Sequence, residues 1–190
     1  MFRTLSLITL GFFMTTAATA ADPRVKFETS FGDIVLELNP AKAPITVKNF
    51  LDYVKDGHYD GLSFHRVIKG FMIQGGGYDE KYEQRKTRPG IQNEAKNGLK
   101  NVRGAISMAR TSAPHSASSQ FFILHQDSDF LDYPGQDGWG YAVFGKVVSG
   151  LDVVDKIAES KTGRLPPFGQ DVPVTPILIK KATIEAATAK

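Results

Sequence analysis

The sequence contains no cysteine and only one tryptophan among its 190 residues. Without thiols the chain has no disulfide framework, no cysteine nucleophile, and no thiolate-ligated zinc or iron–sulfur site. The fold must therefore be held by its apolar core. With 42% hydrophobic and 23% charged residues, the composition is that of an ordinary globular domain, and the chain is long enough to bury a full core.

Neither sign of charge is in large excess, because the sequence has 23 Lys and Arg residues and 20 Asp and Glu residues. The densest basic stretch, residues 79–103, interleaves its bases with Asp79, Glu80, Glu83 and Glu94. Such a mixture is typical of a solvated loop, whereas a nucleic-acid interface needs clustered bases. We therefore expect no nucleic-acid partner.

A strongly apolar run lies near the N-terminus. Arg3 precedes the ten-residue run from Leu5 to Met14, and Ala18-Thr19-Ala20 follows with small residues at its first and last positions. This order is typical of an export signal, and the run is too short for a bilayer, which takes about 20 apolar residues. We predict a cleaved signal peptide at 1–20, one domain at 21–190, and no stable membrane insertion after cleavage.

Apolar periodicity in the remaining sequence predicts many short strands and two helices. Strands at 25–29 and 34–38 alternate around a turn and predict a hairpin. Helical spacing predicts amphipathic helices over 44–56 and 151–159. Further β-type runs are separated by Gly-rich or polar turns, namely 62–65, 71–74, 105–109, 120–125, 141–148 and 176–184.

Long polar connections at 75–104 and 126–140 complete this pattern. They favour a mainly β fold, a closed sheet plugged by helices, over alternating βαβ units. The run 121–124 (Phe-Phe-Ile-Leu) has apolar side chains at both parities of a strand. Both faces of that strand therefore need cover, one in the barrel interior and the other under a helix or along a pocket.

The densest chemical cluster is the stretch 64–77, where Met72 and Gln74 share one strand face and a glycine run follows. Arg66 lies just upstream and could return over that face. The same residues equally fit a packed strand with a surface cation.

Other chemistry is poorly supported. Gly75 to Gly77 lack the following Lys-Ser or Lys-Thr of a phosphate loop, and His58 and His65 lack zinc spacing. Ser118 and Ser119 stand in no nucleophile elbow. We therefore expect no metal and no cofactor.

Four blocks in a fixed order resemble the cyclophilin-type peptidyl-prolyl isomerases. They are Phe64-His65-Arg66-Val67-Ile68, Gly70-Phe71-Met72-Ile73-Gln74-Gly75-Gly76, Ser119-Gln120-Phe121-Phe122-Ile123 and Val143-Phe144-Gly145-Lys146-Val147. The resemblance extends from about Val25 to Ile184 and is far more specific than any single block. The runs Asn93-Glu94-Ala95 and Asn97-Gly98-Leu99 are also similar to the bacterial exported branch, which implies a periplasmic location.

The resemblance implies an eight-stranded antiparallel β-barrel capped by two α-helices, with a substrate groove on its outer surface. It implies an enzyme that isomerises Xaa-Pro bonds while exported proteins fold. Arg66 and Gln74 would be catalytic, with Gln74 orienting Arg66, and Arg110 would lend mainly backbone groups. The proline-containing substrate would contact Phe71, Met72, Ala109, Gln120, Phe122, Phe130, Leu131 and Tyr141.

Two positions depart from the family's usual eukaryotic pattern. Phe130 stands where that pattern has tryptophan and Tyr141 where it has histidine, with 134–140 as an insertion between them. Trp139 lies inside the insertion and so does not replace the missing indole. Without the indole N–H contact, the resemblance implies only weak binding of the inhibitor cyclosporin.

Two other functions stay open on the sequence. The same groove could hold proline-containing segments as a chaperone without turnover, although Arg66 and Gln74 together favour the enzyme. A barrel could instead carry a lipophilic ligand, because strand alternation does not distinguish a filled barrel from a hollow one. For this protein we expect a monomer.

Overall fold

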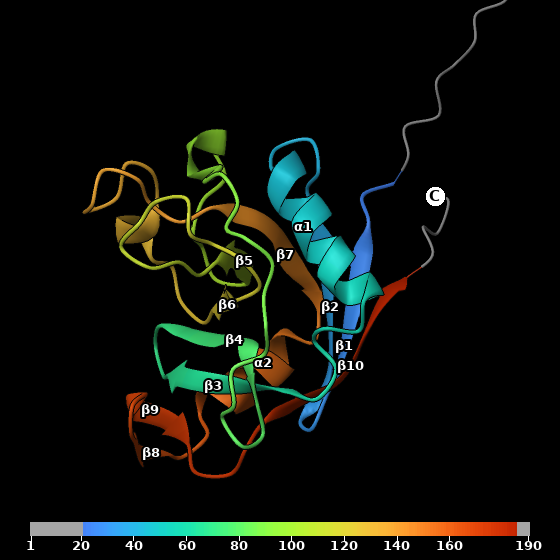
Figure 1. Cartoon of the computed structure of the whole chain (residues 1–190), viewed down its shortest axis with the longest axis vertical. Coiled ribbons are helices and arrows are strands. Elements are labelled where there is room, and N and C mark those ends of the chain that lie inside the picture. Colours follow the sequence, from blue (N-terminus) through green and yellow to red (C-terminus); the bar gives the residue numbers. More distant parts are fainter. Residues whose placement is uncertain (1–20, 186–190) are drawn as a thin grey trace, which may run out of the picture.

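Eight strands form a closed antiparallel barrel in the computed structural model, which describes residues 21–185 (Figure 1). The barrel strands are β1 (Arg24–Thr29), β2 (Gly32–Leu38), β3 (Leu62–Ile68), β4 (Met72–Asp79), β5 (Ala105–Met108), β6 (Phe121–Leu124), β7 (Val143–Ser149) and β10 (Leu178–Glu185). Around the barrel their order is β1-β10-β3-β4-β6-β5-β7-β2. The predicted closed sheet is thereby confirmed, and the predicted signal peptide lies outside the described residues.

Two helices pack against the barrel, α1 (Pro44–Lys55) and α2 (Leu151–Ala158). Proline opens α1, where its missing N–H breaks no helical hydrogen bond, and Gly150 precedes α2 with a φ of +84°. Both predicted helices are confirmed, each ending one residue earlier than expected. Within residues 21–185, no helix is long and apolar enough to cross a membrane.

The chain continues β4 through the three glycines that the sequence pattern assigned to a turn. A Cβ at Gly76, where φ is +86°, would lie 2.8 Å from the carbonyl oxygen of Ser119. A Cβ at Gly77 would lie 2.7 Å from the Gln120 side chain. The glycines are therefore required by close packing within the strand, the close backbone approach that a glycine run allows.

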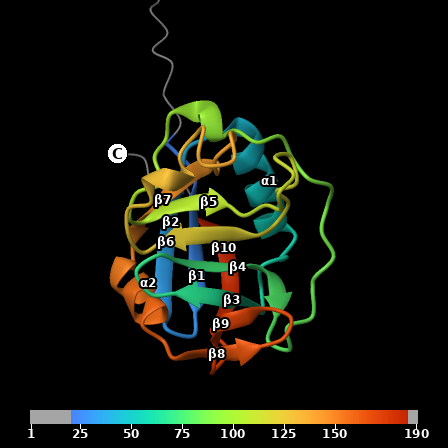
Figure 2. The same cartoon turned by 90° about the vertical axis from the view of Figure 1, so that its left-hand side faces the viewer.

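A small hairpin outside the barrel was not predicted. It joins β8 (Thr162–Leu165) to β9 (Gly169–Pro173), and it lies beside β3 (Figure 2). Two short 3₁₀ helices, η1 (Ala95–Asn97) and η2 (Asp129–Leu131), interrupt the long polar connections. These elements are too short and too polar to give a periodic apolar signal.

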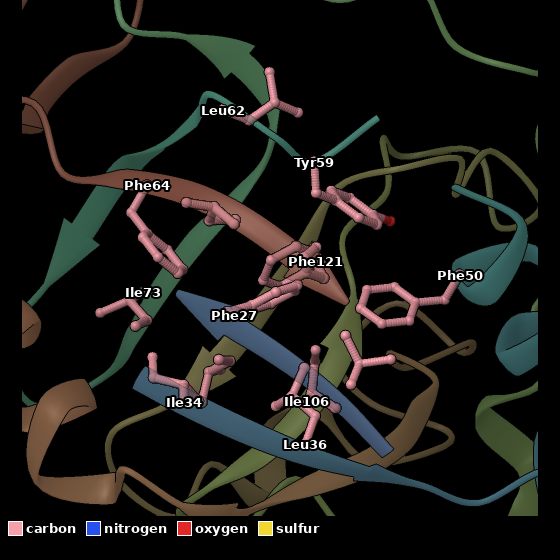
Figure 3. Close-up of a cluster of buried hydrophobic side chains, with 14 of the residues drawn as sticks. Phe27, Ile34, Leu36, Phe50, Tyr59, Leu62, Phe64, Ile73, Ile106 and Phe121 are labelled. Atoms are coloured by element: carbon pink, nitrogen blue, oxygen red, sulfur yellow. The ribbon is translucent and has the colours of Figure 1, made fainter. Parts of the chain in front are cut away.

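Aromatic rings fill the barrel interior. Phe27 of β1 stacks on Phe121 of β6 with 5.4 Å between ring centroids, and Phe50 of α1 lies 5.1 Å from Tyr59 (Figure 3). The Tyr59 hydroxyl donates a hydrogen bond to the Ser119 carbonyl oxygen at 3.0 Å. These contacts occupy the space that a lipid carrier would have to leave open.

Strand β6 buries both of its faces, as its sequence predicts. Phe121 and Ile123 belong to the cluster inside the barrel. Phe122 and Leu124 belong to a second cluster on the outer face, together with Met72 of β4. This second cluster forms the floor of the site described next.

The aromatic stack gives a direct test of the core. Phe27→Ala should lower the free energy of unfolding by about 3–5 kcal/mol, because it removes a fully buried ring and leaves a cavity. Urea denaturation measures the change. Phe31→Ala is the matched control, since Phe31 lies at the turn of the same hairpin with 39% of its surface exposed, and it should change stability by less than about 0.5 kcal/mol. A loss below 1 kcal/mol for Phe27→Ala would contradict the described packing.

Candidate active site

A groove of about 450 Å³ lies on the outer surface of the barrel, along the strands β3, β4 and β6, which run side by side (Figure 2). It collects ten of the eleven residues predicted for the site. The eleventh, Gln120, hydrogen-bonds to Gln74 at the groove. The lining residues are Arg66, Phe71, Met72, Gln74, Ala109, Arg110, Phe122, Phe130, Leu131, Gly135, Gln136, Asp137, Gly140 and Tyr141.

One part of the groove is apolar. Met72, Phe122 and Leu131 are buried, with 2%, 5% and 8% of their surfaces exposed. The Phe71 and Phe130 rings stand over them with 5.6 Å between centroids. A pocket with these walls suits a small aliphatic ring and offers it no hydrogen-bonding side chain.

The polar part of the groove faces this pocket. Arg66 of β3 pairs with Gln74 of β4 in the sheet register, so the two side chains start from neighbouring positions. Gln74 Nε2 donates to Gln120 Oε1 at 3.0 Å. Arg66 and the hydrogen-bonded Gln74–Gln120 pair thus provide the polar side chains of this part of the groove.

The partner of Arg66 differs from the expected one. Within residues 21–185, no hydrogen bond joins Gln74 to Arg66. Arg66 instead forms an ion pair with Asp171 of β9, and its Nε lies 3.5 Å from Asp171 Oδ2. Asp171 belongs to the hairpin that the sequence pattern missed. Only the fold brings this carboxylate to the groove, so no local motif could have found it.

Arg110 plays a larger part than the backbone role expected for it. Its guanidinium is 3% exposed, ion-pairs with Asp137, and donates to the Gly140 carbonyl oxygen from Nε at 3.2 Å and from Nη2 at 3.0 Å. It also lies 4.4 Å from the centroid of the Tyr141 ring. Arg110 therefore ties the loop before β7 to the groove.

Asp137, the partner of Arg110 in that ion pair, also binds the backbone of the same loop. Its carboxylate accepts the N–H groups of Trp139 at 3.0 Å and Gly140 at 3.1 Å. The Arg110 guanidinium first, and then these two N–H groups, lower the pKa of Asp137 to about 2. The sequence analysis missed four lining residues of the groove, all in this loop: Gly135, Gln136, Asp137 and Gly140.

Trp139 lies in this loop but not among the lining residues. It packs edge-on against His115 with 5.1 Å between ring centroids. As expected, it does not replace an indole at the position of Phe130, which lines the groove itself.

The buried histidines are structural. Burial lowers the pKa of His65 to about 4, so the ring is neutral at pH 7 and packs against Tyr78 at 4.7 Å. Burial also lowers the pKa of His58. Within the described part of the chain, no three His, Asp or Glu side chains gather as a metal site requires.

Comparison with known proteins identifies the family. The sequence model described as "Cyclophilin type peptidyl-prolyl cis-trans isomerase/CLD" matches residues 24–184. The chain belongs to the cyclophilin-type peptidyl-prolyl isomerases. It is 54% identical over 162 residues to peptidyl-prolyl cis-trans isomerase B of Escherichia coli (strain K12), covering 84% of this chain and 98% of that one.

Other cyclophilins support this assignment. Peptidyl-prolyl cis-trans isomerase A of Dickeya dadantii (strain 3937) is 51% identical over 179 residues, covering 94% of this chain and 93% of its own. The crystal structure of a cyclophilin-type isomerase from Cryptosporidium parvum superposes with a TM-score of 0.71 at 28% identity, covering 87% of this chain and 98% of that one. This cyclophilin is therefore a peptidyl-prolyl cis-trans isomerase.

The Arg66–Asp171 pair predicts a measurable effect. Asp171→Asn should lower kcat/KM for an uncharged Xaa-Pro peptide about threefold, the scale expected of a partly exposed ion pair that orients a side chain. Raising the NaCl concentration to about 0.5 M should lower the wild-type value and leave the variant unchanged, because salt screens the pair.

Asp152→Asn is the control for this prediction. It makes the same charge change on α2, where Asp152 pairs with Lys156 at 2.9 Å and lines no part of the groove. It should leave kcat/KM and its salt dependence as in the wild type. Equal activity of Asp171→Asn and wild type at low salt would show that the pair does not orient Arg66.

Proposed function

We propose that this cyclophilin accelerates rotation about Xaa-Pro bonds in exported polypeptides while they fold, with Arg66 as the residue that stabilises the twisted bond. One observation carries the catalytic part of the proposal. The guanidinium of Arg66 lines a groove whose apolar floor is formed by the buried side chains of Met72, Phe122 and Leu131. The reaction breaks no bond, so it needs no nucleophile.

The barrier explains what the site must do. Resonance gives the prolyl C–N bond partial double-bond character, and rotation about it costs roughly 18–20 kcal/mol. In the twisted transition state the nitrogen regains a localised lone pair. A hydrogen-bond donor aimed at that nitrogen binds the twisted form more strongly than either planar form, and this difference in binding is the catalysis.

Arg66 suits this role because the guanidinium is planar, always charged and rich in N–H donors. Asp171 contacts it on the Nε side, at 3.5 Å. An acceleration of about 10⁵-fold requires the activation free energy to fall by about 7 kcal/mol. One preorganised charged donor and the exclusion of water together supply this lowering.

The apolar pocket holds the proline ring while the preceding residue rotates. Met72, Phe122 and Leu131 supply the floor, and Phe71 and Phe130 supply the walls. The Gln74–Gln120 pair lies beside this pocket and offers amide groups to the substrate backbone. A second crystal structure of the Cryptosporidium parvum isomerase, in the presence of the dipeptide Ala-Pro, supports a proline-containing ligand for this groove.

A chaperone that binds proline segments without turnover is the second candidate. The apolar pocket favours it as much as it favours the enzyme, because binding alone needs only that pocket. The guanidinium distinguishes the two, because only the twisted form presents a localised nitrogen lone pair to this donor. We also propose that the protein acts as a monomer. One chain supplies all fourteen lining residues of the groove, so the site needs no residue from a second copy.

The export part of the proposal rests on residues 1–20. Arg3, the apolar run from Leu5 to Met14 and the small residues around Thr19 match a cleaved signal. The absence of cysteine is compatible with an oxidising compartment, where the chain has no thiol to misoxidise. We therefore propose a periplasmic location for the mature domain.

Arg66→Ala should lower kcat/KM for an Xaa-Pro peptide about 100-fold or more while the circular dichroism spectrum stays that of the wild type. Arg66→Lys should lower it at least about tenfold, because a point charge does not reproduce the planar fork. Arg164→Ala, which removes an exposed arginine from β8 outside the groove, should leave it within about twofold. Full activity of Arg66→Ala would overturn the mechanism and favour a binding role for the groove.

Phe130 sets the response to cyclosporin. Wild type should bind this inhibitor weakly, because phenylalanine at this wall of the groove offers no N–H donor. Phe130→Trp should tighten the dissociation constant about tenfold, the value of one good hydrogen bond with added ring contact. Isothermal titration measures both proteins, and an unchanged constant would count against this position of Phe130.

Export is tested by the N-terminus of the protein recovered from a Gram-negative host. The full chain should accumulate in the periplasmic fraction and begin at Ala21. Ala18→Arg should block cleavage without affecting the isomerase activity of the folded domain. A full-length chain that begins at Met1 and stays with the cytoplasmic fraction would overturn the export proposal and leave the isomerase assignment intact.

A further inference from the structure

The turn between β3 and β4 brings Phe71 to the groove. Phe71 N–H donates to the Ile68 carbonyl oxygen at 3.0 Å, and Gly70 adopts a φ of +75° to make this turn. The Gly70 N–H points away from the turn and donates to Nδ1 of His125 at 3.1 Å. The side chain of His125 thus accepts a hydrogen bond from the backbone of the turn.

His125 holds the turn by two separate bonds. It directly follows β6, and its own N–H donates to the Phe71 carbonyl oxygen at 2.8 Å. Any residue at this position makes the backbone bond, but only an acceptor side chain makes the bond to Gly70. The side chain of His125 is 14% exposed, so water has limited access to replace it.

The other face of the imidazole meets a carboxylate. Nε2 lies 3.3 Å from Oδ1 of Asp155 on α2. Asp155 Oδ2 accepts from Nη2 of Arg103 at 2.8 Å, and Nη1 of Arg103 donates to the His125 carbonyl oxygen at 2.8 Å. Because Nδ1 accepts a hydrogen bond, the neutral ring carries its proton on Nε2. The contact of Nε2 with Asp155 Oδ1 lacks hydrogen-bond geometry.

The charged groups around His125 nearly balance. Asp155 and Arg103 lie against the ring and its backbone, and Asp127 accepts the Arg103 N–H at 2.7 Å. Lys69 of the turn pairs with Glu159 after α2 at 3.5 Å. The carboxylates of Asp155 and Glu159 are thus paired with Arg103 and Lys69, respectively.

We infer that His125 is a positioning residue for the isomerase, because its neutral imidazole fixes the turn that carries Phe71 into the groove. An imidazolium is a donor at both nitrogens and accepts no hydrogen bond. Protonation therefore breaks the Gly70 bond, frees the turn and loosens one wall of the proline pocket. Acid pH weakens the enzyme through this contact.

The reaction itself transfers no proton, so pH dependence of the rate reports on the site and not on the chemistry. Histidine side chains change charge between about pH 5 and 8. Two other groups near the groove do not change charge in most of this pH range, since the pKa of Asp137 is about 2 and that of His65 about 4. A change of rate in this range that disappears when His125 is replaced would then be assigned to the contact with Gly70.

The test compares pH profiles of wild type and His125→Asn. In the variant, the asparagine Oδ1 takes the place of Nδ1, accepts from Gly70 and does not titrate. Wild-type kcat/KM should fall about fivefold from pH 8 to pH 5, the scale of one hydrogen bond. The fall should appear mainly in KM, because Phe71 contacts the planar and twisted forms alike.

His125→Asn should keep the wild-type pH 8 value within about twofold and show no fall at pH 5, whereas His125→Ala should be weaker at every pH. His115→Asn is the matched control, since it removes a histidine that contacts Trp139 and not the β3–β4 turn, and it should keep the fall. A flat wild-type profile, or a fall that persists in His125→Asn, would overturn the inference.

Nitrogen-15 NMR of the wild type tests the same contact without any variant. At pH 8 the His125 ring should be the Nε2–H tautomer, and the Gly70 amide signal should move with the titration of that ring. A ring protonated on Nδ1 at pH 8, or a Gly70 amide that ignores the titration, would also overturn the inference.

Discussion

The two-sided burial of strand β6 is the constraint on which the rest of the structure depends. Phe121 turns inward and stacks on Phe27, while its neighbour Phe122 turns outward into the groove floor. The stability of the barrel and the shape of the proline pocket are therefore set by adjacent residues on one rigid element. A pocket built on such a strand is preorganised, because its floor cannot shift unless the core shifts with it.

Ion pairs and hydrogen bonds then place the parts that the strands do not hold. Arg110 and Asp137 tie the loop before β7 against the groove, and Asp171 reaches Arg66 from the β8–β9 hairpin. The partly exposed Arg66–Asp171 pair contributes little to stability, so its importance is geometric. The Arg110–Asp137 pair fixes a wall of the groove, and the Arg66–Asp171 pair fixes the guanidinium donor beside the apolar floor.

Much of this architecture was predictable from the sequence, for reasons that differ between its parts. The barrel strands and both helices carry apolar periodicity. The family resemblance located ten of the lining residues, five of them inside the four blocks. The glycines of β4 read as a turn because their need arises from Ser119 and Gln120, some forty residues away along the chain. Asp171 was missed for the same reason, since only the folded barrel brings β9 beside β3.

The central claim is that the groove binds the twisted prolyl bond more strongly than either planar form. NMR exchange spectroscopy on an Xaa-Pro peptide tests it most directly, because it yields the affinities of the cis and trans forms and their interconversion rate on the enzyme. The account predicts that Arg66→Ala slows interconversion on the enzyme and leaves both affinities nearly unchanged. Weaker binding of both forms with an unchanged interconversion rate would contradict it.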